Sequence, residues 1–352
     1  MGDWRTKLLE WYGVNKRDLP WRNTNDPYKI WLSEVILQQT RVQQGWQYYL
    51  RFIEKYPTVS ALATDPQHDV LKLWQGLGYY SRARNLHEAA RFIKAKYKGK
   101  FPKEYESIRA LKGVGDYTAG AVASIAFNLP FPAVDGNVMR VYSRLFGITA
   151  PINSSKGKKE LSKIAGELLP HETPGIYNQA VMELGAMVCL PAKPHCENCP
   201  IQEACYAYLH KKVSEFPVKD GKTKQRNRYF NYLVIIHAGK ILIRLRTAKD
   251  IWQNLYDFPM LETTKRVSTS AFLKNKRWEE LIHLSKPVID NVSEEYVHIL
   301  SHQKLHARFY KINMATEPAK IPGGCSWIKL KDMENYAVPR LIELYIRKIF
   351  LK

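Results

Sequence analysis

LKGVGDYTAGAV, from Leu111 to Val122, is the stretch of sequence that decides the fold. It predicts a helix that ends at Gly113, a tight Gly-Val-Gly turn, and a second helix of small residues that starts near Asp116. Glycine allows a tight turn and a close approach of the backbone to a ligand. The first amides of the second helix would face outward, where they suit a phosphate. A plain helix–turn–helix connection would use Gly113 and Gly115 equally well.

The composition favours phosphate binding, because it points to a polyanionic partner. The chain has 352 residues, 45% of them hydrophobic, which predicts two or three domains. Its formal net charge of +21 indicates nucleic acid first and a membrane surface second. No apolar run approaches the roughly 20 residues that span a bilayer, and the first residues lack a signal-peptide core. We therefore expect a cytoplasmic protein in reducing surroundings, with no membrane partner.

Residues 1–213 have the pattern of a helical region. Asp26 and Pro27 are typical of an N-cap and a first helical position, and the apolar run after them predicts one buried helix over residues 28–56. Gly147 is a typical stop for the last of several further helices. We expect these further helices at residues 69–77, 81–97, 118–128 and 137–147.

The periodicity changes after residue 213. Residues 214–228 are charged and contain few large apolar groups, which predicts a linker. In the following domain, residues 229–352, two apolar runs flank a turn at residues 237–240, and residues 304–314 alternate between apolar and polar side chains. Both patterns are typical of strands. The segment 339–350 predicts a closing helix, so this domain should contain strands and helices.

Four of the five cysteines form a compact pattern. Cys189, Cys196, Cys199 and Cys205 have the spacing C-x6-C-x2-C-x5-C, whereas Cys325 lies far away in the sequence. Disulfides would need an oxidising compartment, against the reducing setting expected above. Four thiolates suit either a structural zinc ion or an iron–sulfur cluster, and spacing alone does not separate these two.

Two acidic residues stand out from their surroundings. Glu34 lies in the apolar run SEVILQQTRV, where a carboxyl group is costly unless it is neutral or hydrogen-bonded. Because burial raises the pKa of a carboxyl group, Glu34 would suit a general acid near neutral pH as well as a structural role. Asp135, in AVDGNVMR, starts a predicted helix and by itself is best interpreted as an N-cap.

These strings, together with LPWR at residues 19–22 and GLGYYSRARNL at residues 76–86, closely resemble the MutY-type adenine DNA glycosylases. The stretch 111–122 is similar to the helix-hairpin-helix element of the superfamily that includes endonuclease III. The resemblance covers essentially the whole chain. It implies an enzyme of base excision repair that flips adenine, mispaired with 8-oxoguanine or guanine, out of double-stranded DNA. We expect it to hydrolyse the N-glycosidic bond and to act as a nucleoid-associated monomer.

The resemblance also implies a multidomain fold. Residues 1–213 would form the all-α helix-hairpin-helix glycosylase fold, with a loop at residues 189–205 that holds a 4Fe–4S cluster through the four cysteines. Residues 229–352 would form a MutT (Nudix)-like α/β domain that recognises 8-oxoguanine. The Nudix metal motif is missing after FPMLE, so this domain should bind rather than hydrolyse. Its recognition loop matches HILSH, where Leu300 stands in place of the phenylalanine common in the family.

Individual roles follow from the same resemblance. Glu34 would protonate the leaving adenine, Asp135 would stabilise the oxocarbenium-like sugar, and Tyr117 would help to hold Glu34 and the base. The remaining matches are contacts to DNA or to its bases: Arg22 in the adenine pocket, Gln39 and Tyr79 as wedges in the opened stack, Thr40 and Leu77 near 8-oxoguanine, Gly113 and Gly115 at a phosphate, and His298, Ser301 and His302 in the recognition loop.

Two alternatives are disfavoured by particular residues. A bifunctional lyase like endonuclease III would carry a lysine where this chain has Tyr117, and a phenol cannot form a Schiff base. A non-catalytic, metal-containing DNA-binding protein would fit the charge and the cysteines. The joint presence of Glu34, Tyr117 and Asp135 in matching motifs argues against it.

Overall fold

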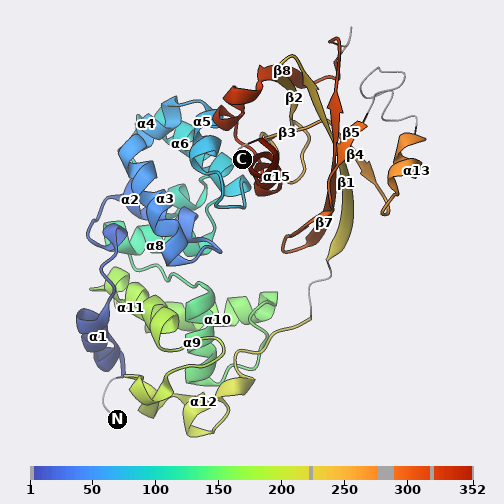
Figure 1. Ribbon diagram of the computed structural model, residues 1–352. Coiled ribbons are helices and arrows are strands. Elements are labelled where there is room, and N and C mark those ends of the chain that lie inside the picture. Colours follow the sequence, from blue (N-terminus) through green and yellow to red (C-terminus); the bar gives the residue numbers. More distant parts are fainter. Residues whose placement is uncertain (1–3, 222–224, 276–288, 318–320, 351–352) are drawn as a thin grey trace. The chain divides into compact units, whose positions relative to one another are not determined.

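The computed structural model describes residues 4–221, 225–275, 289–317 and 321–350 (Figure 1). The chain divides into two compact units, residues 1–64 with 85–221 and residues 65–84 with 222–352. The second unit thus contains a short internal segment as well as the C-terminal part of the chain, which the predicted boundaries at residues 213 and 229 do not anticipate. In the described ranges, none of the helices has the length and apolar character that a membrane crossing requires.

Regular structure in the described part of the first unit is helical, as the sequence predicts. The N-cap and stop signals are confirmed: Asp26 accepts a hydrogen bond from the Tyr28 amide at 2.9 Å, and Gly147 ends α9 with a φ of 65°. The helices are α1 (Trp4–Asn15), η1 (Pro20–Arg22), α2 (Pro27–Leu37), α3 (Val42–Lys55), α4 (Val59–Thr64), α6 (Ser81–Tyr97, which begins in the second unit), α7 (Tyr105–Arg109), α8 (Asp116–Phe127), α9 (Gly136–Phe146), α10 (Ser155–Leu168), α11 (Pro174–Met187), η2 (Cys196–Asn198), η3 (Gln202–Ala204), α12 (Tyr206–Leu209) and η4 (Val213–Glu215).

Two helix predictions were wrong in extent. The single helix expected over residues 28–56 is two helices, α2 and α3, because Gln39 has a φ of 55° and its left-handed backbone interrupts the helix. The helix expected to end at Gly113 ends at Arg109, and Gly113 lies in the following turn with a φ of 78°. The second helix of this hairpin, α8, begins at Asp116 as predicted.

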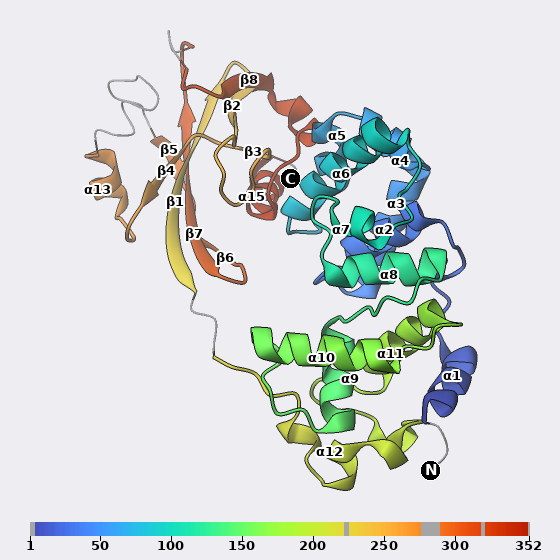
Figure 2. The same cartoon turned by 180° about the vertical axis from the view of Figure 1, so that it is seen from behind.

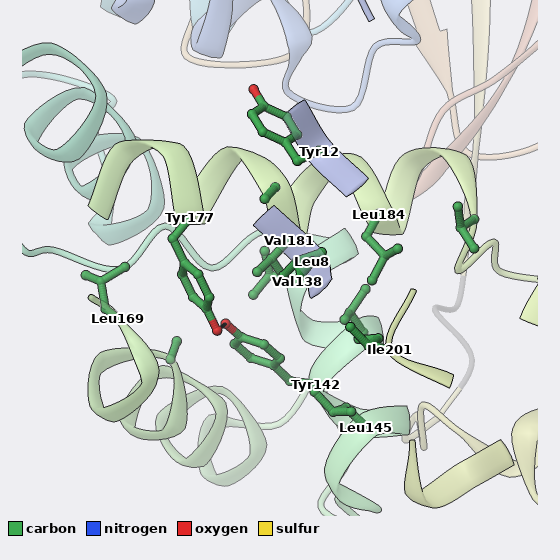
Figure 3. Packing of buried hydrophobic residues seen from close by; sticks show 14 of the residues in the cluster. Leu8, Tyr12, Val138, Tyr142, Leu145, Leu169, Tyr177, Val181, Leu184 and Ile201 are labelled. Atoms are coloured by element: carbon green, nitrogen blue, oxygen red, sulfur yellow. Dashed lines mark hydrogen bonds between the residues drawn. The ribbon is translucent and has the colours of Figure 1, made fainter. Parts of the chain in front are cut away.

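A hydrophobic core fixes the position of α9, the helix that follows Asp135 (Figure 3). Leu8 of α1, Val138 of α9 and Leu184 of α11 are buried together in it. Two buried tyrosines, Tyr142 of α9 and Tyr177 of α11, point toward each other, and the Tyr142 hydroxyl donates to the Tyr177 hydroxyl at 3.3 Å. Close packing on three helices leaves α9 little freedom to shift.

Eight strands form one mixed sheet among the described residues of the second unit. Its path is β3-β2-β1-β7-β5, with β4 also paired to β1, β6 to β7 and β8 to β2. β1 and β7 run parallel, whereas β1 and β2 form the predicted hairpin in which His237 pairs with Lys240. The strands are β1 (Arg226–His237), β2 (Lys240–Leu245), β3 (Tyr256–Asp257), β4 (Met260–Thr263), β5 (Ile289–Val292), β6 (Tyr296–Ile299), β7 (Gln303–Asn313) and β8 (Cys325–Lys329). β1 begins inside the stretch predicted as a linker, because its first residues pair with β7.

Helices cover both faces of this sheet, with α13 (Thr269–Leu273) on one side and α15 (Arg340–Phe350) on the other (Figure 2). Phe272 stacks on Tyr310 of β7 with ring centroids 4.1 Å apart, and Tyr345 stacks on Phe309 at 3.9 Å. Neighbouring residues of β7 thus serve opposite faces, as the period of a strand requires.

The internal segment 65–84 of the second unit carries α5 (Gln67–Leu73) and packs next to η5 (Leu330–Asn335). The Lys72 ammonium donates to the Tyr336 carbonyl at 3.2 Å, and the Gln75 side chain accepts from the Val338 amide at 3.1 Å. These bonds fix the loop that follows α5, where Leu77 and Tyr79 lie.

Candidate functional site

The hairpin between α7 and α8 presents backbone at the surface. Glycine is required at position 113 for two reasons. Its φ is positive, and a Cβ there would lie only 2.7 Å from the Cβ of Asn85. Gly115 is the N-cap of α8 and brings no side-chain cap to the first amides of that helix. Uncapped amides at an exposed helix start suit an anionic oxygen, so this hairpin can hold a phosphate.

Glu34 is buried in α2 and receives a hydrogen bond from the Tyr117 hydroxyl of α8. Burial raises the pKa of Glu34 to about 7, while the Tyr117 hydrogen bond acts in the opposite direction. Burial also holds the pKa of Tyr117 well above its ordinary value, so the phenol remains a donor. A carboxyl group with this pKa can both give and take a proton near neutral pH.

Asp135 is both an N-cap and a neighbour of this pair. Its carboxylate accepts from the Val138 amide at 2.8 Å and from the Asn137 side chain at 2.7 Å. Burial raises the pKa of Asp135, and these hydrogen bonds limit the rise. The charge of Asp135 is one of the causes that raise the pKa of Glu34. The structure therefore brings Glu34, Tyr117 and Asp135 together from three different helices.

A third carboxyl group, Glu183 of α11, was missed by the sequence analysis. It is completely buried and accepts paired hydrogen bonds from Arg22, at 2.8 and 2.6 Å, and from Arg17, at 2.8 and 2.6 Å. Although burial opposes it, these bonds lower the pKa of Glu183 to about 2, so this carboxylate stays ionised. The signal that singled out Glu34, an acidic residue in an apolar helix, is also present at Glu183.

An open pocket lies beside this ion pair. Its lining includes Arg17, Leu19, Val42 and Trp46. Trp46 is held by edge contact with the ring of Trp21, at 5.8 Å between centroids. The pocket therefore combines apolar side chains with polar ones, which are those of Arg17, Asp18, Gln43 and Gln47.

Gln39 and Thr40 lie in the break between α2 and α3. Gln39 is exposed and left-handed, and such a backbone conformation at a residue other than glycine is often found at functional sites. Thr40 is half-buried, and its hydroxyl donates to the Gln38 carbonyl at 3.4 Å.

In the second unit, Tyr79 meets the predicted recognition loop. Tyr79 is exposed and has a φ of 47°, and its hydroxyl lies 2.6 Å from the Ser301 hydroxyl. Ser301 and His302 are exposed at the turn between β6 and β7, whereas His298 is half-buried in β6. Burial lowers the pKa of His298, so this imidazole is neutral at pH 7. Leu77, by contrast, is buried.

The four cysteines that follow α11 line one small cavity. Cys189 is fixed from α9: the Arg140 guanidinium donates to its carbonyl at 2.7 Å, and the Arg144 guanidinium donates to its sulfur at 3.3 Å. Burial raises the pKa of Cys199 to about 12, and the charges of the other three cysteines act in the same direction. The four thiols are therefore close enough to influence one another.

Comparisons with known proteins agree with this geometry. The sequence model of the HhH-GPD superfamily base excision DNA repair proteins matches residues 32–171, and that of the NUDIX domain matches residues 231–348. Adenine DNA glycosylase of Buchnera aphidicola subsp. Acyrthosiphon pisum (strain APS) is 34% identical over 97% of both chains. The mouse and human adenine DNA glycosylases are 34% and 32% identical, each over 97% of this chain and over 77% and 73% of their own lengths.

Two solved structures share the helical fold. A thermostable thymine-DNA glycosylase is 32% identical, with a TM-score of 0.54, and covers 58% of this chain and 95% of its own. Endonuclease III in a non-covalent DNA complex is 24% identical, with a TM-score of 0.51, over 59% of this chain and 94% of its own. The predicted fold class, a helix-hairpin-helix unit followed by a Nudix-like domain, is confirmed.

The pKa of Glu34 predicts how stability changes with pH. In the folded protein Glu34 holds its proton up to about pH 7, whereas in the unfolded chain it ionises near its ordinary pKa of 4.5. The free energy of unfolding that Glu34 contributes is therefore lost as the pH rises through 7. Glu34→Gln should abolish this loss, which amounts to roughly 2–3 kcal/mol between pH 5 and pH 8.

The measurement is chemical denaturation of both proteins at pH 5 and pH 8, with Glu54→Gln as the matched control, since Glu54 is exposed on α3. The assigned pKa would be contradicted if the difference in free energy of unfolding between wild type and Glu34→Gln were the same at both pH values.

Proposed function

Since the chain belongs to the adenine DNA glycosylase family, we propose that it excises adenine mispaired with 8-oxoguanine or guanine from double-stranded DNA. As a DNA glycosylase, it acts in base excision repair. The observation that carries the proposal is the hydrogen bond from Tyr117 to a buried Glu34 whose pKa is about 7. In this proposal residues 1–213 carry the chemistry, and residues 229–352 recognise the lesion together with Thr40 and Leu77.

Glu34 acts as the general acid. Because its pKa is about 7, a large fraction of Glu34 is protonated at neutral pH and can give its proton to the leaving adenine. Tyr117 keeps the carboxyl group in one orientation through its hydrogen bond. Protonated adenine is a better leaving group, so the bond between its N9 and the sugar C1′ breaks more easily.

Asp135 stabilises the positive charge that develops on the sugar. Two carboxyl groups in different environments carry different roles, as in glycoside hydrolysis. Its hydrogen bonds from Val138 and Asn137 favour the ionised form that this role needs. Water then adds at C1′ and leaves an abasic site. Tyr117 has no amine with which to attack the sugar, so the reaction is hydrolysis without a lyase step.

The flipped adenine lies beside Glu34 and Arg22, whose charges act on each other. Glu183 stays ionised and holds the guanidinium groups of Arg17 and Arg22 in fixed planes. Planar guanidinium groups bind the edge of a base with good geometry. Arg22 therefore serves the adenine pocket from within an ion pair, which the sequence pattern does not indicate.

Further residues contact the rest of the DNA. The hairpin at Gly113 and Gly115 binds a phosphate, as uncapped amides and the charge of +21 favour. Gln39 and Tyr79 enter the stack that adenine has left, and their exposed, left-handed positions support this role. The further contacts, all to 8-oxoguanine or its surroundings, come from Thr40, Leu77, His298, Ser301 and His302.

The cysteine cavity fits a 4Fe–4S cluster held by Cys189, Cys196, Cys199 and Cys205. Four thiolates suit a tetrahedral zinc ion as well as an iron–sulfur cluster, and the family resemblance favours the cluster. When bound, the cluster supplies a cross-link that holds residues 189–205 in shape.

Substitution of either catalytic carboxyl group tests the chemistry. Glu34→Gln keeps the shape but cannot deliver a proton, so single-turnover excision should fall about 10²–10⁴-fold while mismatch binding persists. The excision rate of Asp135→Asn should fall by a similar factor, although asparagine is an equally good N-cap. Asp26→Asn is the matched control, because Asp26 caps α2 in the same way. Near wild-type rates for Asp135→Asn would show that Asp135 serves only as the N-cap of α9.

The cofactor assignment is tested by metal analysis of anaerobically purified protein. We expect about four iron and four sulfide per chain, with loss of both in Cys199→Ser. Cys325→Ser is the control, because Cys325 lies in β8 of the second unit and should leave the iron content unchanged. One zinc per chain without iron would show that the site is a structural zinc centre.

Ser301→Ala tests lesion recognition. Loss of one hydrogen bond to 8-oxoguanine should reduce the preference for adenine opposite 8-oxoguanine over adenine opposite guanine by roughly fivefold or more. Ser326→Ala, at an exposed serine of β8, is the control. Point variants are preferable to deletion of the C-terminal domain, because residues 65–84 pack within the same unit. If the ratio of single-turnover rates on the two mismatches is unchanged, Ser301 does not contribute to recognition of 8-oxoguanine.

A further inference from the structure

A run of basic residues surrounds the C-terminal end of α6 and has no role in the proposed base removal. Residues 89–103 contain six basic residues and no acidic one. All six are exposed, namely Arg91, Lys94, Lys96, Lys98, Lys100 and Lys103. The acidic residues that flank the run are Glu88, Glu104 and Glu106, so positive charge prevails at this surface.

The dipole of α6 explains only part of this run. Cations in the last turn of a helix are favoured, and Lys94 and Lys96 lie in that turn. The effect falls off beyond the last turn. Because α6 ends at Tyr97, its dipole does not account for Lys100 and Lys103. A partner with many negative charges would account for the whole run.

Neighbouring side chains order part of this basic surface without neutralising it. The Lys94 ammonium donates to the Thr64 hydroxyl at 2.7 Å. The Lys96 ammonium lies 5.4 Å from the ring centre of Phe92 and 5.3 Å from that of Tyr97. The helix that brings Thr64, α4, contains no charged residue. Both ammonium groups therefore keep their charge for an anion from outside.

The basic surface is distant from the hairpin to which the proposed function assigns a phosphate. That hairpin meets α6 near Asn85, because a Cβ at Gly113 would lie 2.7 Å from the Cβ of Asn85. From Asn85 to Tyr97 the helix rises by about 18 Å, at 1.5 Å per residue. The Debye length is only about 10 Å at 0.1 M salt. A phosphate at the hairpin is thus screened from these cations, which must act on a different phosphate.

The residue types select among negatively charged partners. Five of the six cations are lysines, and lysine is depleted at protein–protein interfaces, where arginine is enriched. Exposed lysines bind the phosphate backbone of DNA by releasing its counterions, whatever the base sequence. Lys96 lies over both neighbouring rings, so Phe92 and Tyr97 hold a cation and are not a platform for unpaired bases. These features favour a duplex over an acidic protein or a single strand.

We propose that the exposed basic residues 91–103 form a second site for duplex DNA, separate from the site at which adenine is excised. The site binds phosphates and reads no base. A protein that holds two DNA segments at once can pass from one to the other without dissociating first, which would serve the search for mismatches. This role goes beyond the proposed excision of adenine.

Binding of a short, mismatch-free duplex to the full chain, with its cofactor, tests the proposal. Sedimentation at low salt should find two duplexes per chain. The combined variant Lys96→Gln, Lys100→Gln and Lys103→Gln should bind the second duplex at least about tenfold more weakly, and the slope of log affinity against log salt should decrease by about 2.7, since each lost phosphate contact contributes about 0.9. The matched control removes the same charge at exposed lysines of the second unit and should bind like wild type: Lys265→Gln, Lys329→Gln and Lys331→Gln.

Transfer between segments is measured by competition. The dissociation rate of a labelled mismatch duplex should rise with the concentration of unlabelled duplex in the wild type and in the control. In the combined lysine variant the rate should not depend on the competitor. A rate independent of competitor in the wild type would contradict the proposed transfer.

One duplex per chain at saturation, or equal binding of the second duplex by the lysine variant, would overturn the proposal. Lysine-dependent binding of poly-L-glutamate without a second duplex would also overturn it, because the surface would then fit an acidic protein. The double variant Lys100→Gln and Lys103→Gln leaves α6 unchanged, so it gives the same test if the triple variant unfolds at a lower temperature. The stoichiometry is measured on DNA without a mismatch, so failure of this proposal and failure of adenine excision are distinguishable.

Discussion

Burial of carboxyl groups is the constraint on which the helical unit depends. An uncompensated charge in an apolar interior is costly, and such groups are either paired or neutralised. The structure uses both solutions within one site. Glu34 has a phenol as its hydrogen-bonding neighbour and a pKa of about 7, whereas Glu183 has two guanidinium groups and a pKa of about 2. Two buried glutamates of the same chain thus differ by orders of magnitude in proton affinity, because burial raises the pKa of Glu34, whereas two guanidinium groups outweigh burial at Glu183.

Much of the fold could be predicted from patterns formed by residues close in sequence. The cap at Asp26, the stop at Gly147 and the hairpin around residues 237–240 depend on neighbouring residues, so they could be predicted from sequence. The break at Gln39 could not, since neither glycine nor proline marks the residue with the left-handed backbone. Asp135 shows a different limit of sequence-based prediction. From the sequence, a helix cap and a charged group of the site were competing interpretations, whereas in the structure Asp135 caps α9 and also acts through its charge on Glu34. The place of residues 65–84 in the second unit could not be predicted either, because it depends on contacts with residues far away in the sequence.

A chain of hydrogen bonds along α9 links the cysteine loop to one candidate catalytic carboxylate, that of Asp135. Asn137 donates to Asp135 at 2.7 Å and accepts from Arg140 at 2.9 Å, and Arg140 reaches the Cys189 carbonyl at 2.7 Å. Each member is fixed by the next, and α9 itself is locked into the core by Val138 and Tyr142. The loop and the start of α9 therefore share one rigid support, although they are more than fifty residues apart in sequence.

The division of the chain has a consequence for how the protein can be taken apart. Because residues 65–84 belong with residues 222–352, the backbone passes between the two units three times, at residues 64, 84 and 221. A protein with one connection can lose either half by a single cut. Here a cut near residue 221 would strand α5 and the Tyr79 loop without the partners of Lys72 and Gln75. Removal of residues 222–352 therefore also takes away the hydrogen-bond partners of an internal segment, so the second unit is not a separable C-terminal piece.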